Sequence, residues 1–124
     1  MPTNDERVAT DLLQLFNERR FDEYVAGFTD DAVVIYPQSA ERIVGADNLR
    51  AMFHAFESPP TFAVTNTRSC GDDVVVEADG DYGSGEPWKV VIIYTFRERR
   101  VSAETAYFGA PFEAPAWRAP FATK

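Results

Sequence analysis

The feature that most constrains this chain is a series of three strand-like runs joined by two short turns, at 74–109. The runs cover 74–82, 88–96 and 101–108, and the middle one is rich in β-branched and aromatic residues, which favour strands. Gly and Pro at 83–87 separate the first two, because glycine supplies turn conformations and proline cannot continue a central ladder. Consecutive strands with short connections pair antiparallel, so the stretch predicts a meander with two faces.

Three helices are predicted before the meander. The first begins at a capping box formed by Thr3 and Glu6, the second is capped by Asp22, and the third follows Gly45. Each carries apolar residues that would face a core. These residues are Val8, Leu12, Leu15 and Phe16 in the first helix, Tyr24, Val25 and Phe28 in the second, and Leu49, Met52, Phe53 and Phe56 in the third.

The remaining segments complete an α+β arrangement. Strands are predicted at 32–36, which Pro37 ends, and at 62–70, whereas the polar stretch 38–42 has the composition of a loop. Helices segregated on one face of an antiparallel sheet form an α+β fold. At 124 residues the chain has the length of one domain, 1–124, in which 110–124 is a Pro-rich C-terminal strap.

Charge and composition exclude several classes of partner. The net charge of −8 argues against nucleic acid, and no run approaches the roughly 20 apolar residues of a membrane-spanning helix. The polar N-terminus is not a signal peptide, and Cys70 has no second cysteine with which to form a disulfide. We therefore expect a soluble cytoplasmic protein that binds neither nucleic acid nor membrane.

Three motifs resemble one family. They are FDEYVAGFTDDAVVIYP at 21–37, GADNLRAMF at 45–53, and ETAYF at 104–108 after a charged hairpin. Together they are similar to the SnoaL-like branch of the nuclear-transport-factor-two-like superfamily. The resemblance implies a cone-shaped fold in which three N-terminal helices pack on the concave face of a curved, barrel-like sheet and enclose a pocket. Members include polyketide cyclases, ketosteroid isomerases, limonene epoxide hydrolases and proteins of unknown function, so the fold does not fix the function.

The chain departs from two activities of this superfamily. The positions of the general base and the two oxyanion groups of ketosteroid isomerases correspond here to Tyr36, Leu12 and Ile92. The arginine and aspartate of limonene epoxide hydrolases correspond to Val90 and Ile92. None of these side chains can perform those roles, so neither usual activity is expected. If the chain is an enzyme, the resemblance implies an isomerase, cyclase or lyase that needs no cofactor.

Glu104 is the most informative residue for function. The resemblance places it inside the cone, where an acid either has a raised pKa or binds donors such as Tyr36 and Tyr94. SnoaL-type cyclases are similar in using an acid on a late strand for proton transfer. We predict Glu104, Tyr36 and Tyr94 as catalytic residues; the alternative is a glutamate that only holds the cone together. The predicted pocket lining consists of Leu12, Phe16, Phe28, Phe53, Tyr82, Trp88, Val90, Ile92 and Phe108.

Metal sites are not indicated. Glu77, Asp79 and Asp81 alternate on the strand face that points away from the cone, and one histidine with one cysteine cannot form a closed zinc site. His54 lies off the apolar stripe of its helix and is expected at the surface.

The outer sheet face and the tail predict further contacts. Val91, Ile93, Ala103, Thr105 and Tyr107 form an apolar convex face, which favours a homodimer. Phe112, Trp117 and Phe121 recur between prolines in 110–124, which indicates an extended strap packed on the body or on the partner subunit.

The sequence therefore supports two functional hypotheses. In the first, the cone binds a small, mostly apolar molecule with a carbonyl or hydroxyl group and catalyses isomerisation, cyclisation or dehydration, with Glu104 as the proton shuttle. In the second, the domain is a non-catalytic module for small-molecule binding or dimerisation.

Overall fold

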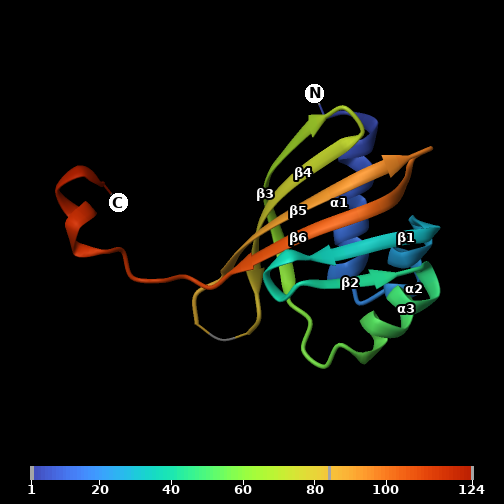
Figure 1. Ribbon diagram of the computed structural model, residues 1–124, viewed down its shortest axis with the longest axis horizontal. Coiled ribbons are helices and arrows are strands. Elements are labelled where there is room, and N and C mark those ends of the chain that lie inside the picture. The colour runs from blue at the N-terminus through green and yellow to red at the C-terminus, as the bar shows by residue number, and fades with distance from the viewer. Residues whose placement is uncertain (1, 84, 124) are drawn as a thin grey trace.

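The computed structural model describes residues 2–83 and 85–123. Along the chain lie α1 (Asn4–Asn17), α2 (Phe21–Ala26), β1 (Phe28–Tyr36), η1 (Pro37–Ser39), β2 (Glu41–Val44), α3 (Ala46–Ala55), β3 (Thr61–Cys70), β4 (Asp73–Asp81), β5 (Trp88–Arg97), β6 (Arg100–Gly109) and η2 (Ala116–Phe121). The strands form one curved sheet in the order β2-β1-β6-β5-β4-β3, in which only β1 and β6 run parallel. Figure 1 shows α1 crossing one face of the sheet, with α2 and α3 near β1 and β2. This is the predicted α+β cone.

The meander and the first and third helices are confirmed, except that Phe56, expected on the third helix, lies just beyond its end and is 41% exposed. Strands β4, β5 and β6 pair antiparallel, and Val76 lies opposite Ile92, which in turn lies opposite Ala106. The N-terminal capping box is present, because the Thr3 side chain accepts from the Glu6 amide while the Glu6 carboxylate accepts from the Thr3 amide. The Glu6 carboxylate also accepts from Ser69 on β3, so the start of α1 is fastened to the sheet.

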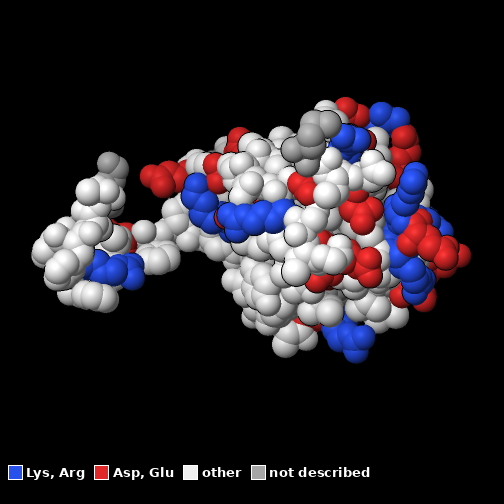
Figure 2. All heavy atoms as spheres, turned by 90° about the horizontal axis from the view of Figure 1, so that it is seen from above, with Lys and Arg blue, Asp and Glu red and all other residues white. Residues whose placement is uncertain are grey.

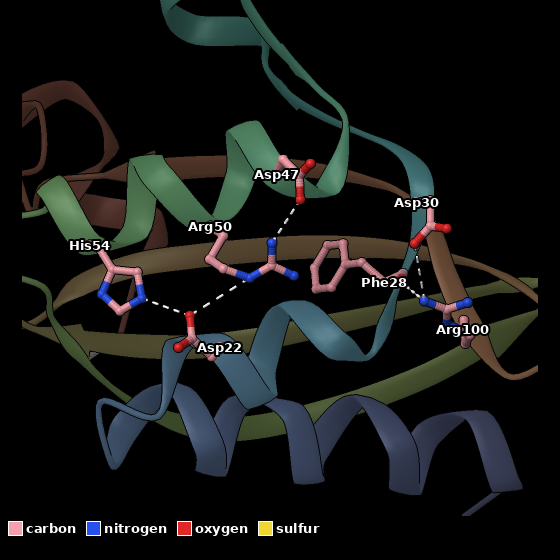
Figure 3. A network of polar contacts seen from close by, with 7 residues as sticks. All are labelled: Asp22, Phe28, Asp30, Asp47, Arg50, His54 and Arg100. Carbon is pink, nitrogen blue, oxygen red and sulfur yellow. Dashed lines mark hydrogen bonds and ion pairs between the residues drawn. The ribbon is translucent and has the colours of Figure 1, made fainter.

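The second helix was predicted wrongly in two respects. Its N-cap position is Arg20, which makes no side-chain cap, rather than Asp22, and Phe28, which was expected on the helix, begins β1. The Asp22 carboxylate instead contacts α3, where it lies 2.7 Å from His54 Nε2 and 3.7 Å from Arg50 Nε (Figure 3). His54 is exposed, as predicted.

A sixth strand was missed because the stretch 38–42 is polar. Within it Glu41 and Arg42 belong to β2, which pairs with β1 and places Glu41 opposite Tyr36. Since β2 is an edge strand, most of its side chains are exposed and its sequence lacks the apolar alternation by which a strand is recognised.

The alternation of inner and outer side chains is confirmed over β4 and β5 and is interrupted once on β6. A bulge between Thr95 and Phe96 pairs these residues with Ala103 and Val101. Val101 is therefore buried in the core, and the Ser102 hydroxyl donates to the Thr95 carbonyl. Beyond the bulge Glu104 still points inward.

The C-terminal segment does not pack on its own chain. It leaves the body after β6 and stands apart from it in two perpendicular views (Figures 1 and 2). Phe112, Trp117 and Phe121 are 81%, 71% and 86% exposed. Of the two predicted positions for the strap, packing on the body is therefore absent, and packing on a partner stays a prediction.

The surface carries charges of both signs, which intermingle on the face shown in Figure 2. Cys70 is exposed with a free thiol. None of the helices in the described residues is long and apolar enough to cross a membrane.

We predict that Thr3→Ala lowers the free energy of unfolding by about 1 kcal/mol, because the first turn of α1 loses its side-chain cap. Thr3→Ser keeps a hydroxyl and is the matched control. Urea denaturation of both variants measures the difference, and equal midpoints for Thr3→Ala and the unaltered chain would contradict the role assigned to this cap.

Candidate functional site

A cavity of about 670 Å³ lies between the concave face of the sheet and the helices. Its wall is mostly apolar, with Met52 and Phe53 from α3, Phe62 from β3 and Ala106 from β6. Six of the residues predicted to line a pocket do so, namely Phe16, Phe53, Tyr82, Trp88, Ile92 and Phe108. Tyr36 and Glu104 line the same cavity.

The structure places three predicted lining residues elsewhere, because they fill the solid part of the core. Leu12 is buried beside Gly27, so closely that a Cβ at Gly27 would lie 2.4 Å from Leu12 Cδ2. Phe28 packs with its ring centroid 5.2 Å from that of Tyr24. Val90 is buried against Gly80. Leu12 and Phe28 thus fill the core beside α2 and the start of β1, and Val90 fills it between β4 and β5.

Glu104 lies at the inner end of the cavity and is only 4% exposed. Its place follows from the sheet register, since on β6 it stands between Val34 of β1 and Tyr94 of β5. Both neighbours are fully buried. The carboxylate thus belongs to a residue whose neighbours on both adjacent strands are shielded from solvent.

Two tyrosines and Glu104 form a hydrogen-bonded chain. The Tyr24 hydroxyl donates to Glu104 Oε1 over 3.2 Å and lies 2.7 Å from the Tyr94 hydroxyl. Because Tyr24 has only one hydroxyl proton, donating it to Glu104 leaves Tyr94 as the donor in the second bond. The chain therefore runs from Tyr94 through Tyr24 to the carboxylate, and Tyr94 contacts the acid only through Tyr24.

Tyr24 is the residue of this hydrogen-bonded chain that the sequence did not predict as part of the candidate site. Its place on the apolar side of α2 predicted that the ring is buried, and it is. No local pattern indicates that its hydroxyl meets an acid 80 residues later in the chain. Burial raises the pKa of Tyr24 and of Tyr94, and the nearby carboxylate raises both further, so both hydroxyls stay protonated.

The pKa of Glu104 is raised to about 7. The larger cause is burial, which disfavours the ionised form, and the hydrogen bond from Tyr24 opposes it. The carboxyl group therefore changes protonation near neutral pH, which is the property that a group exchanging protons with a ligand requires.

The second carboxyl oxygen of Glu104 faces the cavity. Oε2 makes no hydrogen bond within the described residues, and among them no buried side-chain oxygen or nitrogen lacks a partner. Oε2 is therefore accessible, and the accessible space beside it is the cavity. By the same reasoning the Tyr36 hydroxyl, which makes no hydrogen bond within the described residues, is accessible from the cavity. Burial and then the charge of Glu104 raise the Tyr36 pKa, so this hydroxyl is a proton-bearing donor.

No group of three or more His, Cys, Asp or Glu side chains is placed to hold a metal ion in the described part of the chain. Glu77 and Asp79 point away from the cavity and pair with Arg68 and Lys89.

We predict that stability falls as Glu104 loses its proton. The folded chain holds this proton up to about pH 7, whereas the unfolded chain releases it near the ordinary value of 4.5. The free energy of unfolding should therefore drop by about 3 kcal/mol between pH 4.5 and pH 8 relative to Glu104→Gln. Urea denaturation of both proteins over this range measures the drop. Glu98→Gln on the exposed hairpin tip is the control, and a constant difference between the unaltered chain and Glu104→Gln would overturn the prediction.

The comparisons with known proteins agree with this geometry. A solved NTF-2 like protein of unknown function from Burkholderia xenovorans LB400 is 34% identical over 97% of this chain and 94% of its own, with a TM-score of 0.86. A putative ketosteroid isomerase from Kribbella flavida DSM 17836 shares the fold at 21% identity, 97% and 88% coverage and a TM-score of 0.87. A putative SnoaL-like polyketide cyclase from Shewanella putrefaciens CN-32 does so at 11% identity, 88% and 92% coverage and a TM-score of 0.75. No curated protein matches the sequence. Residues 9–104 match the SnoaL-like domain, and the chain belongs to this family.

Proposed function

We propose that the cavity binds a small, mostly apolar molecule bearing a carbonyl or hydroxyl group and that Glu104 exchanges a proton with it. The observation that carries this proposal is a single buried carboxyl at the inner end of an apolar cavity, with one oxygen bound to Tyr24 and the other accessible. Burying a carboxylate without a cationic partner costs free energy. A carboxyl group kept in such a place therefore favours a function that requires it.

The geometry gives each polar group a distinct task. Oε2 of Glu104 accepts a proton from the ligand carbon next to a carbonyl and returns it to the same or another position. The Tyr36 hydroxyl donates to the carbonyl oxygen, on which negative charge develops. Tyr24 and Tyr94 act as positioning residues, since they orient the carboxylate. Return of the proton to another carbon gives isomerisation. If the carbanion instead expels a neighbouring hydroxyl group, that group takes the proton from Glu104 and leaves as water, which is dehydration. If the carbanion attacks a second carbonyl of the ligand, the alkoxide that forms takes the proton, which is cyclisation.

Proton exchange at carbon tests this function without knowledge of the natural substrate. We expect the protein to accelerate deuterium uptake next to the carbonyl of cyclohexanone in heavy water, as followed by proton NMR. Glu104→Gln should reduce the protein-dependent rate by about 100-fold or more, and Tyr36→Phe by a smaller factor, because the base is lost in the first variant and only an oxyanion donor in the second. Equal rates for the unaltered protein and Glu104→Gln would defeat the catalytic proposal.

The second candidate is a non-catalytic module. The observation that favours it is the hydrogen-bonded chain from Tyr94 through Tyr24, which also satisfies Glu104 as a structural group. In that case Glu104→Gln unfolds more readily even at pH 8, where Glu104 is ionised, and no deuterium exchange is seen with either protein.

We also propose that the chain forms a homodimer through its convex sheet face. On this face Val91, Ile93, Ala103 and Thr105 are only partly buried, and Tyr107 is exposed. A partner subunit seated there would also lie close to the end of β6, where the exposed C-terminal segment begins. Large exposed apolar patches mark interfaces, and two-fold dimers are the commonest assembly.

Sedimentation at micromolar concentration tests the dimer. We expect twice the 13.9 kDa mass of one chain, and a monomer for Tyr107→Glu, which places a charge on the proposed interface. Tyr107→Phe keeps the apolar ring and should remain a dimer. A monomeric unaltered chain would refute the proposal.

A further inference from the structure

The cavity around Glu104 has an unbalanced charge. Its lining in the described part of the chain includes two carboxylates, Glu104 at the inner end and Glu41 at the rim, and no lysine, arginine or histidine. On α3, Arg50 and His54 point toward Asp22 of α2 (Figure 3), and neither lines the cavity. Nothing in the lining therefore compensates the charge that Glu104 acquires on ionisation.

The rest of the cavity wall has the chemistry of a cation site. Half of the lining side chains are aromatic. Tyr82 and Trp88 pack with centroids 5.2 Å apart toward the open end, where Trp88 is 38% exposed. Tyr36 and Phe108 lie 6.0 Å apart nearer Glu104. Aromatic faces attract organic cations through their quadrupoles, most strongly for tryptophan and tyrosine and where water is excluded.

An anionic, a neutral and a cationic ligand would interact differently with this cavity. An anion would face two carboxylates without a countercharge, and it would enter only with Glu104 protonated. A neutral molecule would leave the desolvation of the ionised carboxylate uncompensated. A cation would pair with Glu104 and contact the aromatic rings. We infer that the ligand of this cavity carries a protonated amine or quaternary ammonium group beside its apolar part.

This inference rests on the proposed function, because both assign the same cavity to the ligand, and it explains how Glu104 becomes a base. The groups that face Glu104 are Tyr24 from α2, Tyr36 from β1 and Tyr94 from β5, all uncharged near neutral pH, and the carboxylate of Glu41 lies farther out. A bound cation supplies the missing positive charge and lowers the pKa of Glu104. Glu104 is then ionised once the ligand is bound, and it can accept the proton from the ligand carbon next to the carbonyl.

Three probes of nearly the same shape separate charge from size. Choline carries the cation and a hydroxyl, 3,3-dimethylbutan-1-ol replaces its nitrogen by carbon, and 3,3-dimethylbutanoate reverses the charge. In calorimetric titrations of the whole chain at pH 8 we expect choline to bind about tenfold more tightly than the alcohol, with no detectable binding of the carboxylate. Choline affinity should fall about tenfold between pH 8 and pH 6, as Glu104, whose pKa is about 7, becomes protonated.

Three variants assign the effect to the cavity. Glu104→Gln should remove both the preference for choline and its pH dependence, Glu41→Gln at the exposed rim should weaken choline by a smaller factor without affecting folding, and Glu98→Gln should change nothing. If the alcohol binds as well as choline, or the carboxylate binds best, the inference is wrong while the small-molecule function stands. If none of the probes binds the folded protein, the inference is overturned, and the deuterium-exchange measurement decides the proposed function separately.

Discussion

The arrangement of α2, β5 and β6 around the cavity depends on the burial of one carboxyl group. Glu104 lies on a central strand, with fully buried neighbours on both sides, and its charge has no cationic partner among the described residues that line the cavity. Such a group is tolerated only if hydrogen bonds replace part of its lost hydration. The Tyr24 hydroxyl provides that bond, and Tyr94 orients the hydroxyl. The short helix α2 therefore has a task beyond packing, since it brings the donor to the acid.

The same arrangement explains why the acid is neither fixed as an anion nor kept permanently neutral. Burial alone would raise its pKa further, and the bond from Tyr24 lowers it, so the balance falls at about 7. In either protonation state Oε1 is engaged by Tyr24, and Oε2 is left for the cavity. Glu104 can therefore gain or lose its proton on Oε2 while the hydrogen bond from Tyr24 to Oε1 stays in place.

Much of the fold could be predicted from the sequence because its signals are local. The capping box of Thr3 and Glu6, the alternation along β4 and β5, and the inward position of Glu104 all follow from spacing or from the family resemblance. The features that were missed depend on distant partners. Strand β2 exists because β1 offers it an edge, and the bulge at Ser102 depends on how β6 meets β5. Likewise, nothing near Tyr24 in the sequence indicates that its hydroxyl meets Glu104.

The position of the acid also limits which part of a ligand can react. The three positions at which ketosteroid isomerases carry their polar groups are occupied by Leu12, Tyr36 and Ile92, of which only Tyr36 has a polar atom, a hydroxyl. The polar chemistry is therefore concentrated where β6 meets α2, behind the rings of Tyr82 and Trp88 at the open end. Under the function proposed above, a ligand would pass this aromatic rim before its reacting carbon reached Oε2, and its apolar remainder would stay against the rim. The proposed function would thus select molecules whose reactive group is at one end, and among these a positive charge near that end would gain most from the carboxylate.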